Sequence, residues 1–243
     1  MKDIFQSDKT LSNAIYESDD RGLSLFFENI LSQDKAKVEL FRAVDFDLDI
    51  KDDEGKNVIS WIIDNATRYD DKKDKFDFLD FMKYLLNTGI KANSQDKKGE
   101  TSLHKAVLKG CPDLVKILLD IGDASTSAID NLGRTPLHNT VWNDDIINAK
   151  RLLRFSKKSL NCADYAGFFP INYACILGYD KLVIYFIEQN SPIQNDNIKG
   201  LNTVIFMQKH IENLDKLNDN IPDDYEFKHR VVELIQNMKE ELS

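Results

Sequence analysis

Cysteine is scarce in this chain, and its three copies, Cys111, Cys162 and Cys175, show no paired spacing. A disulfide framework needs an even, closely spaced set of cysteines, and structural zinc sites need Cys or His pairs at ligand spacing. The sequence contains neither pattern. We therefore expect a reducing, cytoplasmic environment and no metal.

Long apolar runs are also missing. Runs such as residues 182–187 fall far short of the roughly 20 residues that span a bilayer. Residues 1–10 are too polar for a secretory signal. These absences predict an intracellular protein without a membrane partner, and they carry no information on translocation into a host cell.

Basic residues are outnumbered, with 32 Lys and Arg against 41 Asp and Glu, which gives a net charge of −9. Binding to a phosphate backbone needs clustered Lys and Arg. The charge therefore predicts no nucleic-acid partner, and it favours a partner protein with a basic surface.

Catalytic signatures are absent as well. No phosphate-binding glycine loop and no metalloprotease helix motif occurs. The acidic run that begins at Asp45, Asp47 and Asp49 resembles a calcium loop, but Ile50 and Lys56 stand where that loop needs Gly and Glu. An acidic hairpin explains the run better, so we expect no enzyme, no catalytic residue and no cofactor.

What the chain does contain is a repeat. Gly99, Gly133 and Gly167 are equally spaced along the chain, and each is preceded by Asp three positions earlier. Similar segments follow at 101–106, 135–140 and 169–174. Gly permits the turn, Thr caps a helix, and Pro fits its first position. Each unit then predicts two short amphipathic helices that bury their apolar stripes only by stacking on neighbours.

This pattern resembles the ankyrin repeat family, whose period is about 33 residues and whose helix start reads T-P-L-H-x-A. The resemblance implies an all-α solenoid with about five repeats, each of two antiparallel helices and a hairpin loop. The predicted segments are an N-terminal capping helix at 1–18, repeats at 19–51, 52–95, 96–129, 130–163 and 164–196, and a degenerate repeat with a C-terminal helical cap at 197–243.

One repeat is longer than the others, because the interval from Gly55 to Gly99 exceeds the interval from Gly99 to Gly133. The register counted back from Gly99 places the extra residues near 69–77. A solvated loop or helix extension explains them, and a partner-specific contact is the alternative.

The resemblance also implies a function: a non-enzymatic protein-interaction module, expected to be a monomer, that binds through its concave face. A bacterial effector, an immunity protein and an adaptor would all fit. The alternative is an enzyme or a regulatory subunit whose activity lies in the atypical terminal segments, residues 1–20 and 200–243.

In ankyrin proteins the partner-facing positions surround the turn Gly and the end of the inner helix. Applied here, this register selects mostly apolar residues in the fourth and fifth repeats and charged ones in the third. We expect partner binding by Leu132, Arg134, Trp142, Asn143, Tyr165, Phe168, Ile176 and Leu177, together with Lys97, Lys98 and Glu100. Exposed aromatic residues and Arg are favoured interface anchors. The alternative is that Trp142 and Phe168 fold back into the core.

Overall fold

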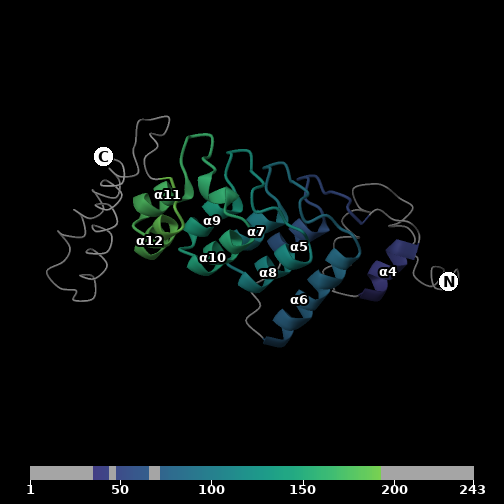
Figure 1. The fold of residues 1–243 in the computed structure, drawn as a ribbon. Coiled ribbons are helices and arrows are strands. Elements are labelled where there is room, and N and C mark those ends of the chain that lie inside the picture. Colours follow the sequence, from purple (N-terminus) through teal and green to yellow (C-terminus); the bar gives the residue numbers. More distant parts are fainter. Residues whose placement is uncertain (1–34, 44–47, 66–71, 193–243) are drawn as a thin grey trace, which may run out of the picture. The chain divides into compact units, whose positions relative to one another are not determined.

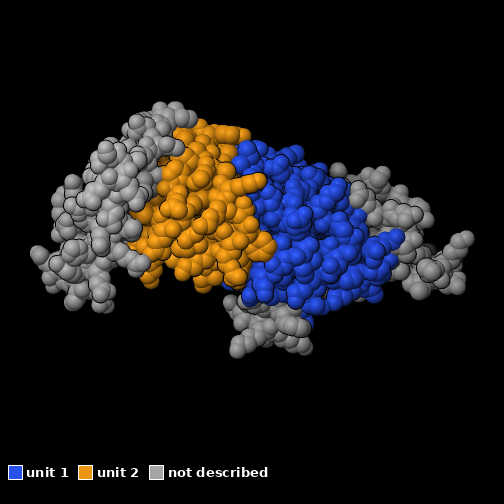
Figure 2. Space-filling model, in the orientation of Figure 1, with its two compact units in different colours: residues 1–131 blue, residues 132–243 orange. Residues whose placement is uncertain are grey.

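The computed structural model describes residues 35–43, 48–65 and 72–192. Their secondary structure is helical (Figure 1), apart from turns and one isolated bridge between Lys51 and Asn57. The all-α prediction is thereby confirmed. The predicted caps, 1–18 and 197–243, lie outside the described residues. The chain divides into two compact units, residues 1–131 and 132–243 (Figure 2), and each is described by itself.

The first unit contains two layers of helices. Its helices are α4 (Lys35–Ala43), α5 (Val58–Asn65), α6 (Lys72–Asn87), α7 (Ser102–Leu108) and α8 (Pro112–Asp120). Helix α7 packs against its sequence neighbour α8, while α5 packs against α7 and α6 against α8. The first helices of successive repeats therefore pack against each other, and so do the second helices, as the repeat predicts.

The second unit repeats this arrangement. Its helices are α9 (Pro136–Trp142), α10 (Ile146–Phe155), the 3-10 helix η1 (Lys158–Asn161), α11 (Pro170–Leu177) and α12 (Asp180–Glu188). Helix α9 packs against α11, and α10 against α12. Helices α5, α7, α9 and α11, the first helix of each repeat, are called the inner helices below.

The Asp-x-x-Gly turns are closed by the aspartate itself. In the turn at Asp96, Oδ1 accepts hydrogen bonds from the N–H groups of Lys98 at 2.8 Å and Glu100 at 2.9 Å. Gly99 has a φ of 76°, and a Cβ built on it would lie 2.7 Å from the backbone nitrogen of Asn131. Both the turn and the close approach of the next hairpin therefore require glycine.

The motif histidines cap the inner helices. Nδ1 of His138 accepts the N–H of Thr135 at 3.0 Å. Its Nε2 therefore carries the proton and donates to the carbonyl of Phe168 at 3.1 Å. Asn172 replaces histidine in the last described repeat, and its Oδ1 accepts the N–H of Phe169 at 2.7 Å. The amide thus preserves the bond to the helix start, although Phe169 has no hydroxyl to complete the cap.

The core consists of the apolar stripes that the repeat predicts. In the second unit, Leu137, Ile171 and Phe186 are fully buried, and each contributes about 1.5–3 kcal/mol by leaving water.

Asp144 takes the left-handed conformation, with φ 49°, in the turn after α9. Gly110 has a φ of 63° at the corresponding place in the preceding repeat.

The extra residues of the long repeat are partly helical. Helix α6 begins at Lys72 and has 16 residues, whereas α8 has nine. The part of the insertion at 72–77 therefore extends this helix, while 69–71 lie outside the described residues.

Candidate protein-interaction surface

The second unit has a group of large apolar side chains in water. They lie in the hairpins and at the ends of α9 and α11, at positions that the sequence selected. We call this group the apolar face, and its members, with their exposed fractions, are Tyr165 (65%), Leu132 (57%), Ile176 (48%), Leu177 (42%) and Trp142 (37%).

An aromatic cluster supports one side of the apolar face. The ring of Tyr173 lies 5.0 Å from that of Trp142 and 5.3 Å from that of Phe168, measured between centroids. Trp142 remains exposed and Phe168 is half-buried. Both rings therefore rest on Tyr173 near the surface, and the alternative that they enter the core is not what the structure shows.

Tyr173 is the residue of this cluster that the sequence reasoning missed. Its hydroxyl donates to Oδ2 of Asp164 at 2.6 Å, and Oδ1 of the same carboxylate accepts the turn N–H groups of Ala166 and Phe168. One carboxylate thus fixes both the hairpin and the ring. The available signal was an aromatic residue at the variable x position of the T-P-L-H-x-A motif.

The hairpin holds Tyr165 in place. Its N–H donates to the carbonyl of Leu132 at 2.9 Å. A Cβ built on Gly133 would lie 2.7 Å from Cδ1 of Tyr165, so the ring lies directly against this glycine. Because the backbone and the ring are both constrained, Tyr165 presents a preorganised aromatic surface.

Two polar residues complete the predicted set in this unit. Arg134 is half-buried next to the turn, and Asn143 is exposed where α9 ends. Both take part in interactions within the molecule. In the sequence they adjoin members of the apolar face, with Arg134 close to Leu132 and Asn143 directly after Trp142.

The other three predicted residues belong to the first unit. Lys97 and Lys98 are exposed in the hairpin, and the N–H of Lys97 donates to the carbonyl of Glu54 at 2.8 Å. Glu100 is half-buried, with its carboxylate 3.4 Å from Nζ of Lys105. Glu100 therefore has an internal partner.

Lys105 is the centre of a buried ionic network that sequence reasoning also missed. Its side chain is 5% exposed, and Nζ lies 2.9 Å from both Asp96 Oδ2 and Asp64 Oδ2. Burial opposes its charge, but hydrogen bonds and charges from Asp96 and Asp64 outweigh it and raise the pKa of Lys105. Burial likewise opposes the charge of Asp64, yet Lys56 and Lys105 lower the pKa of its carboxyl overall.

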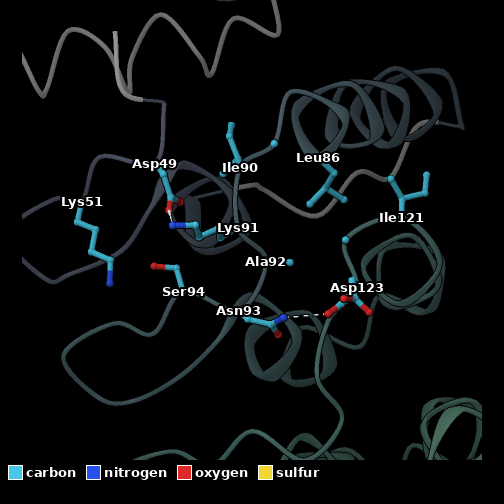
Figure 3. A pocket seen from close by; sticks show the side chains of 12 residues that line it. Asp49, Lys51, Leu86, Ile90, Lys91, Ala92, Asn93, Ser94, Ile121 and Asp123 are labelled. Carbon is cyan, nitrogen blue, oxygen red and sulfur yellow. Dashed lines mark hydrogen bonds and ion pairs between the residues drawn. The ribbon is translucent and has the colours of Figure 1, made fainter. Parts of the chain in front are cut away.

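A pocket of about 560 Å³ lies in the first unit. Figure 3 shows Leu86, Ile90 and Ile121 around it, with Asn93 donating to the carbonyl of Asp123 at 2.8 Å. Leu86 and Ile90 are buried, so of these three apolar residues only Ile121 offers exposed surface. The rest of its lining is largely polar and includes Lys51, Lys91 and Asn93.

The described residues contain no group of three or more side chains suited to a metal ion. Asp49, from the acidic run, accepts the amide of Asn57 at 2.9 Å, and Asp52 closes a turn. Burial raises the pKa of the Cys175 thiol to about 12, which opposes nucleophilic reactivity. Within the described residues, no helix has the length and apolar character needed to cross a membrane.

Helix pairs stacked in register, closed by Asp–Gly turns and by His or Asn caps, define a helical repeat protein. The family model described as ankyrin repeats (3 copies) matches residues 32–130 and 72–164. The chain belongs to the ankyrin repeat family. Ankyrin repeats are generally protein–protein interaction modules.

The chain is also similar to parts of several known proteins. The chain is 34% identical over 114 residues to an ankyrin repeat protein of Rickettsia bellii, which is 46% of this chain and 62% of that protein. It is 38% identical over 110 residues to the neurogenic locus Notch protein of Drosophila melanogaster, covering 45% of this chain and 4% of that protein. With alpha-latrotoxin-Lh1a of Latrodectus hasselti, the identity is 32% over 97 residues, covering 40% of this chain and 7% of the toxin. The chain thus spans less than two thirds of each relative.

Proposed function

We propose that this chain is a non-enzymatic module that binds a partner protein through the apolar face of its second unit. The observation that carries the proposal is the exposure of these large apolar side chains. Tyr165, Leu132, Ile176 and Leu177 each keep more than 40% of their surface in water. A concentration of exposed large apolar side chains in neighbouring hairpins and helix ends is typical of an interaction site.

Rigid support strengthens the proposal. Tyr165 is held against Gly133, and Trp142 rests on Tyr173, which is bonded to Asp164. An ordered aromatic surface loses little conformational entropy on binding. Trp and Tyr are also the residues in which binding energy is concentrated. The two rings are therefore the expected anchors, and Lys97 and Lys98 would act through association rate and salt dependence.

The proposal fits an effector, an immunity protein or an adaptor equally, because each would use the same binding step. Activity in the terminal segments, residues 1–20 and 200–243, is the alternative, and those residues lie outside the described part. The net charge of −9 favours a partner with basic groups around an apolar centre.

The test compares captured proteins quantitatively. Wild-type chain, Tyr165→Ala and Trp142→Ala are immobilised at equal density, and proteins retained from lysate are quantified by isotope-labelled mass spectrometry. The binding constant of the stoichiometric partner is then measured by calorimetry. We expect each substitution to weaken binding by at least about 1–2 kcal/mol.

Ile129→Ala is the matched control, because Ile129 is 41% exposed and lies outside the predicted set. It should leave the binding constant unchanged. If all three variants bind as the wild type does, or if the aromatic variants lose their circular dichroism signal, the apolar face is not the binding site.

A further inference from the structure

A second surface of the second unit differs in charge from the rest of the chain. Residues 146–163 contain no Asp or Glu in a protein with a net charge of −9. The same stretch contains five cationic residues, Lys150, Arg151, Arg154, Lys157 and Lys158. We call this stretch the basic segment.

Helical spacing gathers part of the basic segment on one face of α10. Ile147, Lys150 and Arg154 are three and four residues apart, so they share one side of the helix, and all three are exposed. The buried side contains Leu152 and Leu153. Lys150 places its Nζ 5.5 Å from the ring centroid of Tyr185 in the neighbouring helix α12, and Arg154 follows one turn later on the same side of α10.

Two large apolar side chains accompany the cations. Ile147 is 60% exposed and Phe155 is 51% exposed. They stand eight residues apart on α10, or about 12 Å along the helix. Lys157 and Lys158 follow Phe155 closely in the sequence and are also exposed, so apolar and cationic groups alternate along the basic segment.

The geometry points to an anionic lipid surface as the occupant: we propose that the basic segment docks the second unit peripherally on a membrane that contains acidic phospholipids. Clusters of four to eight Lys and Arg bind such headgroups. Exposed Phe and Ile can then enter the boundary between headgroups and acyl chains. Acidic residues elsewhere in the chain weaken this attraction little, because charges farther away than about 8–10 Å are screened at physiological salt.

A lipid explains the composition better than an acidic protein does. Three of the five cations are lysines, and lysine is depleted at protein interfaces. Ile147 and Phe155 are exposed to solvent, and the boundary between lipid headgroups and acyl chains can accept such apolar side chains without a shaped pocket. This inference is independent of the apolar face and requires no membrane-spanning helix. It differs from the sequence-based expectation of no membrane partner, which rested on the absence of a long apolar run.

The experiment is co-sedimentation of the full chain with vesicles. One set contains about 30% phosphatidylserine in phosphatidylcholine, and the other contains phosphatidylcholine alone. Binding is measured at about 0.1 M and 0.5 M salt. We expect binding only to the acidic vesicles, with a loss of about tenfold or more at the higher salt.

Two double variants change the net charge equally. Arg154→Glu with Lys157→Glu should reduce vesicle binding about tenfold or more. Lys83→Glu with Lys116→Glu changes exposed lysines of α6 and α8 and should change binding less than about threefold. Phe155→Ala should reduce it severalfold while leaving every charge in place.

Three outcomes would overturn the proposal. The first is no binding of the wild type to acidic vesicles, and the second is an equal loss in both double variants. The third is binding to a soluble Glu–Tyr copolymer or to a short single-stranded RNA without binding to vesicles. That result would assign the basic segment to an acidic protein or to nucleic acid.

Discussion

Tyr173 donates a hydrogen bond of 2.6 Å to Asp164, the residue that closes the preceding hairpin. In the first unit, Lys105 and Asp96 occupy the repeat positions that correspond to Tyr173 and Asp164. They form an ion pair at 2.9 Å. In both units the side chain after the capping residue ties the inner helix to its own turn. One unit does this with a buried charge, and the other with a phenol that also supports the apolar face.

The first prediction concerns Tyr173. Tyr173→Phe removes the hydroxyl and leaves Asp164, which is 7% exposed, without one partner, so we expect a loss of about 1–3 kcal/mol in the free energy of unfolding. Tyr173→Ala should cost more because Trp142 and Phe168 lose their ring contact. Urea titration measures both. Equal losses in the two variants would show that the stacking contributes nothing.

The second prediction concerns Lys105. Lys105→Met leaves Asp96 and Asp64 without their shared cation, and we expect a loss of about 3–5 kcal/mol. Adding Asp96→Asn should restore part of it, since the amide oxygen can still accept the turn N–H groups. Guanidinium denaturation is the measurement. A loss below about 1 kcal/mol would mean that the buried ions do not interact as the distances indicate.

The third prediction follows from the lowered pKa of Asp64. A carboxyl whose pKa is lower in the folded state stabilises the protein at pH values above its unfolded pKa of about 3.9. That stabilisation is lost as the pH falls through the folded pKa. The wild type should therefore lose stability on acidification below about pH 5. Lys105→Met should show a shallower loss, because its Asp64 is less stabilised as an anion. Thermal unfolding between pH 6 and 2, sampled at about half-unit steps, tests the slope. If the wild type and Lys105→Met lose stability equally as the pH falls, the prediction is wrong.

The fourth prediction concerns Asp144, which holds a φ of 49°. Glycine adopts this conformation without steric cost, so Asp144→Gly should stabilise the protein by about 0.5–1 kcal/mol. Burial, partly offset by the positive charge of Lys181, raises the pKa of Asp144, so removing its carboxylate should not reduce the gain. Asp144→Ala keeps the Cβ and should not stabilise. Chemical denaturation of the pair separates the backbone effect from the charge effect.

The fifth prediction compares two turn glycines. Gly110 and Gly133 both have positive φ, at 63° and 78°, but only Gly133 lies against another group, the ring and backbone of Tyr165. Gly110→Ala should cost about 1–2 kcal/mol of backbone strain. Gly133→Ala should cost about 1–3 kcal/mol more, because the hairpin must shift. Urea titration of both variants makes the comparison, and equal losses would mean that the Tyr165 ring yields freely.

Local features of this chain were predictable because they depend on neighbours in sequence. The Asp–Gly turns, the caps at Thr101 and Thr135 and the inner helices follow from backbone angles and short-range hydrogen bonds. The regular spacing of the turn glycines indicated which stripes must stack. The exposed aromatic positions at Trp142 and Tyr165 were selected from this register, although their role in binding stays a prediction.

Tertiary structure decided the rest. Lys105 reads in sequence as an exposed lysine, but it is buried because Asp64 and Asp96 converge on it from another helix and a turn. Tyr173 reads as one more helix residue, and only the fold brings Trp142, Phe168 and Asp164 around it. The repeat specifies where each helix begins, whereas the partner of a charge or a ring depends on which segments pack together. Those contacts join residues up to 41 positions apart, and no local pattern encodes them.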